Sequence, residues 1–188
     1  SFFVGTTDWL GKQFVTNYNV FGFESKNFSN ERDYTKAYTY INGIKIALYN
    51  SHLSLTSEQR AVQIAELLTD LQNEEFFILG IDTNVLAVDE LQPFIDAGYK
   101  LGNCGAFGTH YTCGSLFPDN IIVSNNITLC KAETETELFE DPADHRPFIM
   151  TIEVGANEVD EPTQDGVYIL KLTVKNGVRT YKWVSADI

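Results

Sequence analysis

Groups able to perform acid–base or metal chemistry stand at the ends of several predicted strands in this chain. Four apolar runs have the composition of strands, and each has an imidazole, a carboxylate or a carboxamide beside it. Because a sheet holds its strand ends rigidly beside an open crevice, catalytic groups commonly gather there. The runs are 44–51, 76–81, 120–124 and 148–154, and the bordering residues are His52, Asp82, Asn84, Asp119, Asp144 and His145.

Each of these signals has a simpler explanation when it is taken alone. A single histidine is more often a packed or surface residue than a catalytic one. The segment 82–84 (Asp-Thr-Asn) is typical of a turn, because both polar side chains can bond their own backbone. Asp144 and His145 could form a local ion pair. Their joint occurrence beside successive strands favours one shared site, so we expect these side chains to converge in one crevice.

The elements that position these residues follow a strand, helix, strand order. Asn42-Gly43 favours a tight turn between strands at 36–41 and 44–51. Thr56 can cap a helix, with Gln59 completing a capping box. Apolar residues then follow at helical spacing, namely Ala61, Ile64, Ala65, Leu67, Leu68 and Leu71. With the buried strands beyond them, they indicate an α/β or α+β layered sandwich of mixed β-sheets flanked by helices.

Length and composition fit one ordinary domain of 188 residues and 21.2 kDa. Hydrophobic residues make up 44% of the chain, enough for a real core, so wholesale disorder is excluded. No run reaches the ~18 apolar residues of a membrane span. The net charge of −13 argues against non-specific binding to nucleic acid or anionic membrane. A phosphate substrate stays compatible with this charge if a divalent metal supplies positive charge.

Four motifs around these residues resemble the endonuclease/exonuclease/phosphatase superfamily, which includes deoxyribonucleases, sphingomyelinases and inositol-polyphosphate phosphatases. They are 50–53 (Asn-Ser-His-Leu), 79–84 (Leu-Gly-Ile-Asp-Thr-Asn), 118–124 (Pro-Asp-Asn-Ile-Ile-Val-Ser) and 143–147 (Ala-Asp-His-Arg-Pro). The family's counterparts are Asn-Thr-His-Leu, Leu-Gly-Asp-Phe-Asn, Ile-Asp-Tyr-Ile-Phe-Val-Ser and Ser-Asp-His-Arg-Pro. The second motif is displaced by one residue between Gly and Asp. The match covers roughly residues 20–154.

The resemblance implies a metal-dependent phosphoester hydrolase. His145 would be the general base that activates water, and Asp119, within hydrogen-bond reach, would hold its imidazole in the right tautomer and stabilise the protonated form. His52 would donate to a phosphate oxygen or protonate the leaving group.

The same resemblance implies a divalent metal, Mg²⁺ or else Mn²⁺ or Ca²⁺. Asp82 and Asn84 would position the nucleophile and stabilise the pentavalent phosphorus. Asp144 would contribute to the metal site, since hard carboxylate oxygens suit these ions. The substrate would be a phosphoester, whether nucleic acid or another phosphodiester.

The chain departs from the family at its beginning. Family members start with a strand ending in Asn, followed by a Gln-Glu whose Glu is the main metal ligand, and neither motif is present here. We therefore expect the second half of the family fold. The missing N-terminal half would come from the same gene or a partner chain, or the domain is naturally reduced. For the 188 residues alone we expect little or no hydrolysis.

A loop rich in Gly, Asn and Thr contains Cys104, His110 and Cys113. Its spacing lacks the tight cysteine pairs of zinc sites. A Cys104–Cys113 disulfide fits an extracellular protein, and free thiols, with Cys130 as the third, fit either compartment. In the resembling family this loop often touches substrate, which makes His110 and Tyr111 candidate substrate contacts.

The C-terminal segment reads as an appendage. We predict a main domain at 1–154, an acidic linker at 155–166 and a β-hairpin at 167–188, with Asn176-Gly177 at its turn. If Lys175 pairs with Val178, Leu170 faces Trp183, and an apolar-aromatic face forms that must be covered by the body, by another copy in a homo-oligomer or by another protein. The hairpin weakly resembles the ends of bacteriophage fibre and particle proteins.

Two functions remain in competition at this point. The first is a divalent-metal-dependent phosphodiesterase or nuclease module. The second is a non-catalytic adhesion or structural module of a phage-like particle that kept the fold, for which an extracellular or virion-associated location would suit.

Overall fold

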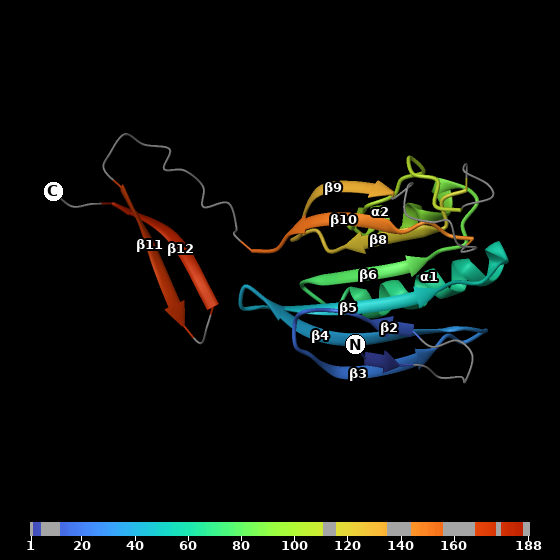
Figure 1. The fold of residues 1–188 in the computed structure, drawn as a ribbon, viewed down its shortest axis with the longest axis horizontal. Coiled ribbons are helices and arrows are strands. Elements are labelled where there is room, and N and C mark those ends of the chain that lie inside the picture. Colours follow the sequence, from blue (N-terminus) through green and yellow to red (C-terminus); the bar gives the residue numbers. More distant parts are fainter. Residues whose placement is uncertain are drawn as a thin grey trace.

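A six-stranded mixed sheet forms the centre of the molecule (Figure 1). The computed structural model describes residues 2–4, 12–110, 116–134, 144–155, 168–175 and 178–185. The sheet order is β3-β4-β5-β6-β8-β7, and β5 and β6 run parallel while its other neighbours run antiparallel. Its strands are β3 (Val20–Asn27), β4 (Asp33–Ile41), β5 (Ile44–His52), β6 (Phe77–Asp82), β7 (Lys100–Leu101) and β8 (Asp119–Val123).

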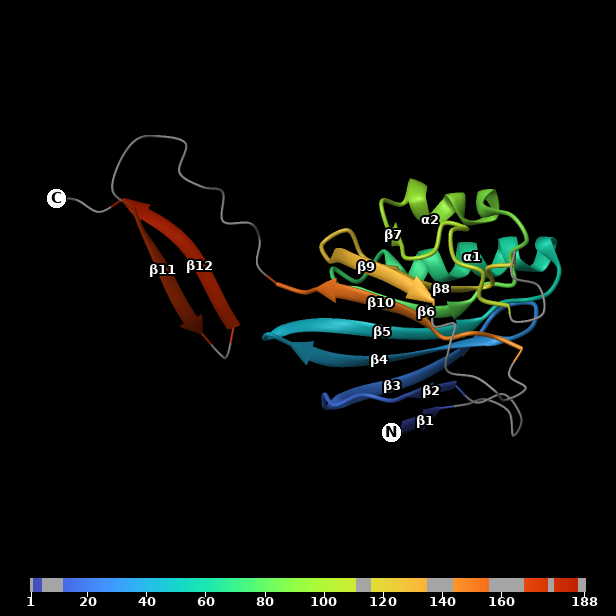
Figure 2. The same cartoon turned by 45° about the horizontal axis from the view of Figure 1, so that its top comes forward.

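Helices cover one face of this sheet, as the turned view in Figure 2 shows. They are α1 (Ser57–Leu71), the 3-10 turn η1 (Val88–Leu91) and α2 (Gln92–Asp96). The core beneath them is apolar and aromatic, with Tyr49, Leu67, Phe77, Leu79 and Phe94 almost completely buried. This packing fixes the helix-side face of β5 and β6, so the alternate residues of both strands must point to the opposite face.

A second, smaller layer lies on that opposite face. The antiparallel pair β9 (Thr128–Thr134) and β10 (Phe148–Glu153) packs there through Met150 and Ile152 against Val123 and its apolar neighbours. The pair β1 (Phe2–Val4) and β2 (Lys12–Phe14) is the other part of this layer, and the Asn50 side chain donates to the Gln13 carbonyl. In the described residues β2 and β10 each pair with one strand. The layer is therefore split into two pieces.

The predicted layered sandwich is confirmed, and so is the hairpin between 36–41 and 44–51, which extends back to Asp33. Asn42 and Gly43 both have positive φ, as a two-residue type I′ turn requires. The predicted helix begins where expected, but the capping box does not form. The Thr56 hydroxyl bonds the Gln59 side chain instead, and Thr56 makes no side-chain cap to the backbone.

The predicted apolar face of α1 is partly wrong. Ala61 and Ala65 are exposed, whereas the polar residues Arg60 and Gln63 are buried beside Ile64, Leu67 and Leu71. The Arg60 side chain is hydrogen-bonded to segments after β5 and β6, and the Gln63 side chain to segments after β3 and β5, which offsets the cost of burying them.

The C-terminal hairpin forms with the expected pairing. Strands β11 (Tyr168–Lys175) and β12 (Val178–Ser185) are antiparallel, with Lys175 opposite Val178 and Leu170 opposite Trp183. Among the described residues these two strands pair only with each other. The turn at 176–177 and the linker residues 156–167 lie outside the described residues, so the predicted domain boundaries stay predictions. Neither helix of the described part has the length and apolar character needed to cross a bilayer.

Candidate active site

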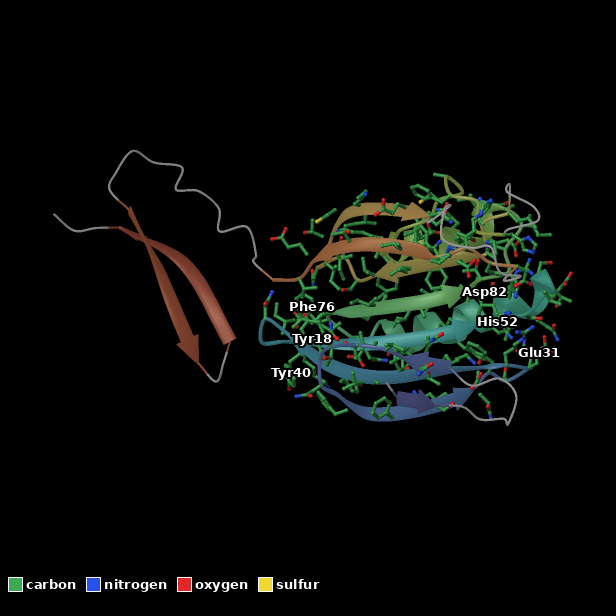
Figure 3. All side chains as sticks on the ribbon, in the orientation of Figure 1. Tyr18, Glu31, Tyr40, His52, Phe76 and Asp82 are labelled. Carbon is green, nitrogen blue, oxygen red and sulfur yellow. The ribbon has the colours of Figure 1, made fainter. Side chains whose placement is uncertain are left out.

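Strand register brings the predicted site residues onto one face of the sheet. His52 at the end of β5 stands opposite Asp82 at the end of β6, and Asp82 stands opposite Asp119 at the start of β8. The next row inward, two residues away and therefore on the same face, is Asn50, Gly80 and Ile121. Figure 3 shows His52 and Asp82 together at one end of the sheet, whereas Tyr40 and Phe76 lie at the other end.

His145 and Asp119 form a hydrogen-bonded pair. His145 Nδ1 lies 2.8 Å from Asp119 Oδ2, and the backbone amide of Asp119 donates to the Thr109 hydroxyl. Burial lowers the pKa of His145, but the charge and hydrogen bond of Asp119 outweigh it, so the pKa is raised from its ordinary value. Burial raises the pKa of Asp119, against the opposing effect of Thr109 and His145. This pair orients the ring so that Nε2 is its reactive nitrogen.

Asp82 links the other side chains of the site. His52 Nε2 lies 3.3 Å from Asp82 Oδ2, and the backbone N–H of Asn84 donates to Asp82 Oδ1 at 3.0 Å. Burial lowers the pKa of His52, and Asp82 opposes this shift. Asn84 has a φ of 51°, an unusual left-handed conformation, and its Nδ2 donates to the Leu53 carbonyl. The Asn84 amide oxygen is therefore the atom that can meet a ligand.

A pocket of about 550 Å³ opens over His52, Asp82 and Asp119, in the size range of small-molecule sites. Its floor comes from β5, β6 and β8, and its walls come from the two pieces of the split layer. Two cationic residues line it, Lys12 from β2 and Arg146 just before β10. Lys12 is itself nearly buried and is paired with Asp33. The pocket therefore combines these positive side chains with the carboxylates of Asp82 and Asp119.

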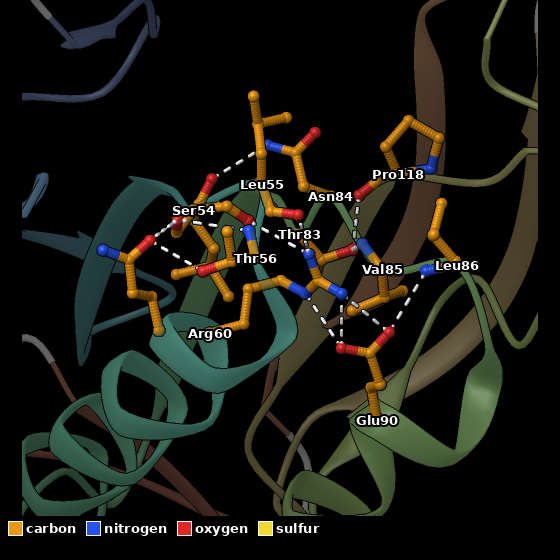
Figure 4. Close-up of polar contacts among 12 residues, drawn as sticks. Ser54, Leu55, Thr56, Arg60, Thr83, Asn84, Val85, Leu86, Glu90 and Pro118 are labelled. Carbon is orange, nitrogen blue, oxygen red and sulfur yellow. Dashed lines mark hydrogen bonds and ion pairs between the residues drawn. The ribbon is translucent and has the colours of Figure 1, made fainter.

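A buried guanidinium holds the loops that follow His52 and Asp82 (Figure 4). Arg60 donates from Nη1 to the carbonyls of Ser54 and Leu55, and from Nε and Nη2 to the Glu90 carboxylate. Its side chain is 2% exposed. Thr83 adds a second anchor, because its amide and its hydroxyl both donate to the Pro118 carbonyl at 2.7 Å.

Some side chains of the site have oxygen atoms suited to a hard divalent cation. Asp82, Asp119 and His145 offer ligand atoms within 4.8 Å of one another, and the Asn84 backbone amide donates to Asp82. Mg²⁺ is commonly held by one or two carboxylates, with water and substrate oxygens filling its other positions. Asp144 is exposed and groups instead with His110 and His145.

Comparison with solved structures shows what this architecture is. An endonuclease/exonuclease/phosphatase family protein from Bacteroides thetaiotaomicron matches with a TM-score of 0.63 at 13% sequence identity, over 74% of this chain and 66% of that one. The chain has the endonuclease/exonuclease/phosphatase fold. D. rerio TDP2 in complex with a single-strand DNA product matches with a TM-score of 0.60 at 19% identity, over 72% and 69% of the two chains.

A third structure with the endonuclease/exonuclease/phosphatase fold is the inositol polyphosphate 5-phosphatase domain of SPsynaptojanin, in complex with inositol (1,4)-bisphosphate and calcium. It matches with a TM-score of 0.53 at 14% identity, over 73% of this chain and 55% of that one. The chain thus spans about two thirds of the first two structures and little more than half of this one. No protein-family model and no curated protein sequence matches the chain. The phage-like resemblance of the hairpin receives no support from these comparisons.

Most of the predicted site residues lie together within this endonuclease/exonuclease/phosphatase fold. His52, Asp82, Asn84, Asp119 and His145 share one end of the sheet, and the expected Asp119–His145 contact is present. His110 lies beside His145, paired with it through a backbone β-bridge. Tyr111 and Cys113 lie outside the described residues, and Cys104 and Cys130 carry free thiols.

Sequence reasoning missed Lys12, Thr109 and Arg146. Arg146 was inside a recognised motif, directly after His145, and its charge was the available signal. Asn50 was also quoted only as part of a motif, although strand alternation places it on the same face as His52. Lys12 comes from a segment with no site-like pattern, and the tertiary fold alone brings it to the pocket. Thr109 directly precedes His110, in a loop already singled out, and it contacts Asp119.

Proposed function

We propose that this chain is the second half of a divalent-metal-dependent phosphoester hydrolase. The observation that carries the proposal is the Asp119–His145 pair, set 2.8 Å apart beside Asp82. Asp82 and Asp119 lie on the floor of a pocket that Lys12 and Arg146 also line. A carboxylate-oriented imidazole is suited to take a proton from water, and the cationic walls suit a phosphate. The fold supports the same reading, because two structures that share it hold a single-strand DNA product and an inositol bisphosphate.

In the proposed reaction His145 accepts a proton from the attacking water at Nε2. Asp119 holds the ring through Nδ1 and stabilises the imidazolium that forms. His52, which borders Asp82, donates to a phosphate oxygen or to the leaving group. Arg146 stands in the pocket wall, where it can neutralise phosphate charge.

The metal would be Mg²⁺, with Mn²⁺ or Ca²⁺ as substitutes, because the available donors are carboxylate and amide oxygens. Asp82 and Asn84 would hold it. When bound, such an ion polarises the phosphoryl oxygen and neutralises its developing charge.

The proposal includes completion of the site by an upstream segment. The sheet face between β2 and β10 is apolar and partly exposed at Leu48, Ile78 and Ile121, as expected of a surface that further strands cover. Such strands would join the two pieces of the split layer and bring another carboxylate to Asp82. The C-terminal hairpin, with its predicted apolar-aromatic face, is proposed to pair copies of the chain, which light scattering on a chain cut at residue 155 would test.

Hydrolysis of a generic aryl phosphodiester by the chain alone, and by the chain joined to its upstream coding segment, tests the proposal. The joined protein should require Mg²⁺ or Mn²⁺ and lose activity with chelator, and the 188 residues alone should show little. His145→Ala should lower kcat by ~10²–10⁴-fold, the usual contribution of a general base.

The outcomes separate the two parts of the proposal. Activity of the 188 residues alone would support hydrolysis and refute completion. Undiminished turnover in His145→Ala would remove the residue from its role. A joined protein that is folded but inactive on several phosphoesters would favour the non-catalytic module.

A further inference from the structure

A nitrogen-rich cluster stands beside the proposed hydrolytic site and has no assigned role. His110, Asp144 and His145 each offer one ligand atom, and these atoms lie within 4.8 Å of one another. The two imidazole centroids are 5.4 Å apart, with the ring planes inclined by 55°. The chain contains three histidines in all, so two of them meet here.

Backbone contacts hold the two segments of this cluster in fixed register. His110 and His145 face each other across an antiparallel β-bridge, and the Arg146 amide donates to the Thr109 carbonyl at 2.7 Å. Thr109 is completely buried and receives the Asp119 amide at its hydroxyl. The histidine backbones are thus anchored to the sheet by these contacts.

His145 is already oriented as a metal-binding histidine is. Its Nδ1 is committed to Asp119, which leaves the lone pair of Nε2 as the one that a metal can meet. Zinc-bound histidines usually have such a carboxylate on their other ring nitrogen, because it fixes the ring and raises its basicity. Asp119 therefore supplies an outer partner without being a ligand itself.

We propose that His110, Asp144 and His145 bind Zn²⁺, distinct from the oxygen-donor site at Asp82 and Asn84. Two imidazoles and one carboxylate are a known zinc donor set, with water in the fourth position. Ligand atoms around tetrahedral zinc stand about 3.4 Å apart at bonds of about 2.0–2.1 Å, so the side chains must close by little more than about 1 Å. Imidazole nitrogen favours zinc over magnesium, so the two sites select different ions.

Zinc at this cluster has a regulatory consequence, which rests on the proposed hydrolytic function. The ion and the attacking water would compete for His145 Nε2, because one lone pair cannot serve both. Zinc would then inhibit hydrolysis that Mg²⁺ supports, and raising the Mg²⁺ concentration would not relieve the inhibition. The binding itself does not depend on hydrolysis and can be measured on the 188 residues alone.

The test is titration of the tag-free 188-residue chain with Zn²⁺ by calorimetry and with Co²⁺ by visible absorption, in excess Mg²⁺ and with thiols alkylated. One ion should bind per chain, with cobalt bands typical of tetrahedral nitrogen and oxygen ligands. His110→Ala and Asp144→Asn should each abolish or weaken binding by more than the about 10–100-fold that loss of an outer-shell partner costs. Asp144 is exposed, so its substitution should leave thermal unfolding unchanged.

His52→Ala is the matched control, because it removes the third histidine and should retain full zinc affinity. Binding that persists in both His110→Ala and Asp144→Asn, or that disappears in His52→Ala, overturns the assignment. Loss of binding on alkylation alone would also overturn it, by assigning the ion to cysteine. If zinc binds as proposed while the joined protein hydrolyses no phosphoester, the metal site stands and the proposed function fails.

Discussion

Replacing Arg60 by alanine should destabilise the protein strongly, although the residue is polar and lies on a surface helix. Its guanidinium is 2% exposed and is committed to the Ser54 and Leu55 carbonyls and the Glu90 carboxylate. Truncation leaves both carbonyls without this donor and leaves Glu90, 24% exposed, without its cation. The cost of breaking one partner from a buried ion pair is about 3–5 kcal/mol.

A loss of this size should be easy to measure, because a domain of this size has a free energy of unfolding of only about 5–15 kcal/mol. Arg60→Ala should lower the urea midpoint greatly without changing the slope. Lys131→Ala is the matched control, since Lys131 and Glu133 form an ion pair at 61% and 45% exposure. Such a surface pair is worth ~0–1 kcal/mol, so its loss should barely move the midpoint.

Arg60→Lys separates charge from geometry. Lysine keeps the positive charge but cannot reach two carbonyls and a carboxylate with one planar fork, so it should recover only part of the lost stability. Equal, small shifts in Arg60→Ala and Lys131→Ala would refute the reasoning, because they would show that the buried network adds no more than the surface pair. Full recovery of stability in Arg60→Lys would refute the argument from the planar geometry of the guanidinium.

Two further predictions concern the site and its support. Asp119→Asn should lower the raised pKa of His145, because it removes the charge that raises it. In ring-proton NMR the protonated ring should then appear only at lower pH, and the acid limb of kcat/KM should shift to lower pH as well. An unchanged titration would show that Asp119 does not set this pKa. Gly102→Ala should destabilise the protein by about 1–3 kcal/mol, because the added Cβ would stand 2.7 Å from Met150 Sδ. Gly80→Ala should be neutral or stabilising, because no atom lies within 4 Å of the added Cβ. Equal effects of the two substitutions on thermal unfolding would contradict this.

The predictable part of the fold is the part governed by local pattern. Asn42-Gly43 specified its turn, and the alternation within β5 and β6 placed His52 and Asp82 on one face. The His145–Asp119 contact was expected from the resemblance of the 118–124 and 143–147 motifs to the family, and it is present. Catalytic side chains at strand ends can be predicted from the sequence, because strand length and the alternation of side chains are local properties.

The features that the sequence did not predict depend on residues distant in the chain. Arg60 and Gln63 were not among the residues expected on the buried face of α1. Arg60 is buried against segments after β5 and β6, and Gln63 against segments after β3 and β5. The strands β1, β2 and β9 were not predicted, because β1 and β2 have only three residues each and β9 has no continuous apolar run. Lys12 reaches the pocket only through such a strand.

The row of opposed residues across β5, β6 and β8 limits how this gene can vary in length. One residue inserted in or deleted from β6 before Asp82 would send that side chain into the helix-side core, and every later contact in the row would change face. Two residues would restore the face but shift Asp82 by about 7 Å along the strand, beyond the reach of His52. Insertions in the loop after α1 meet no such constraint, so length variants there should keep the opposed row of His52, Asp82 and Asp119, whereas variants within β6 should lose it.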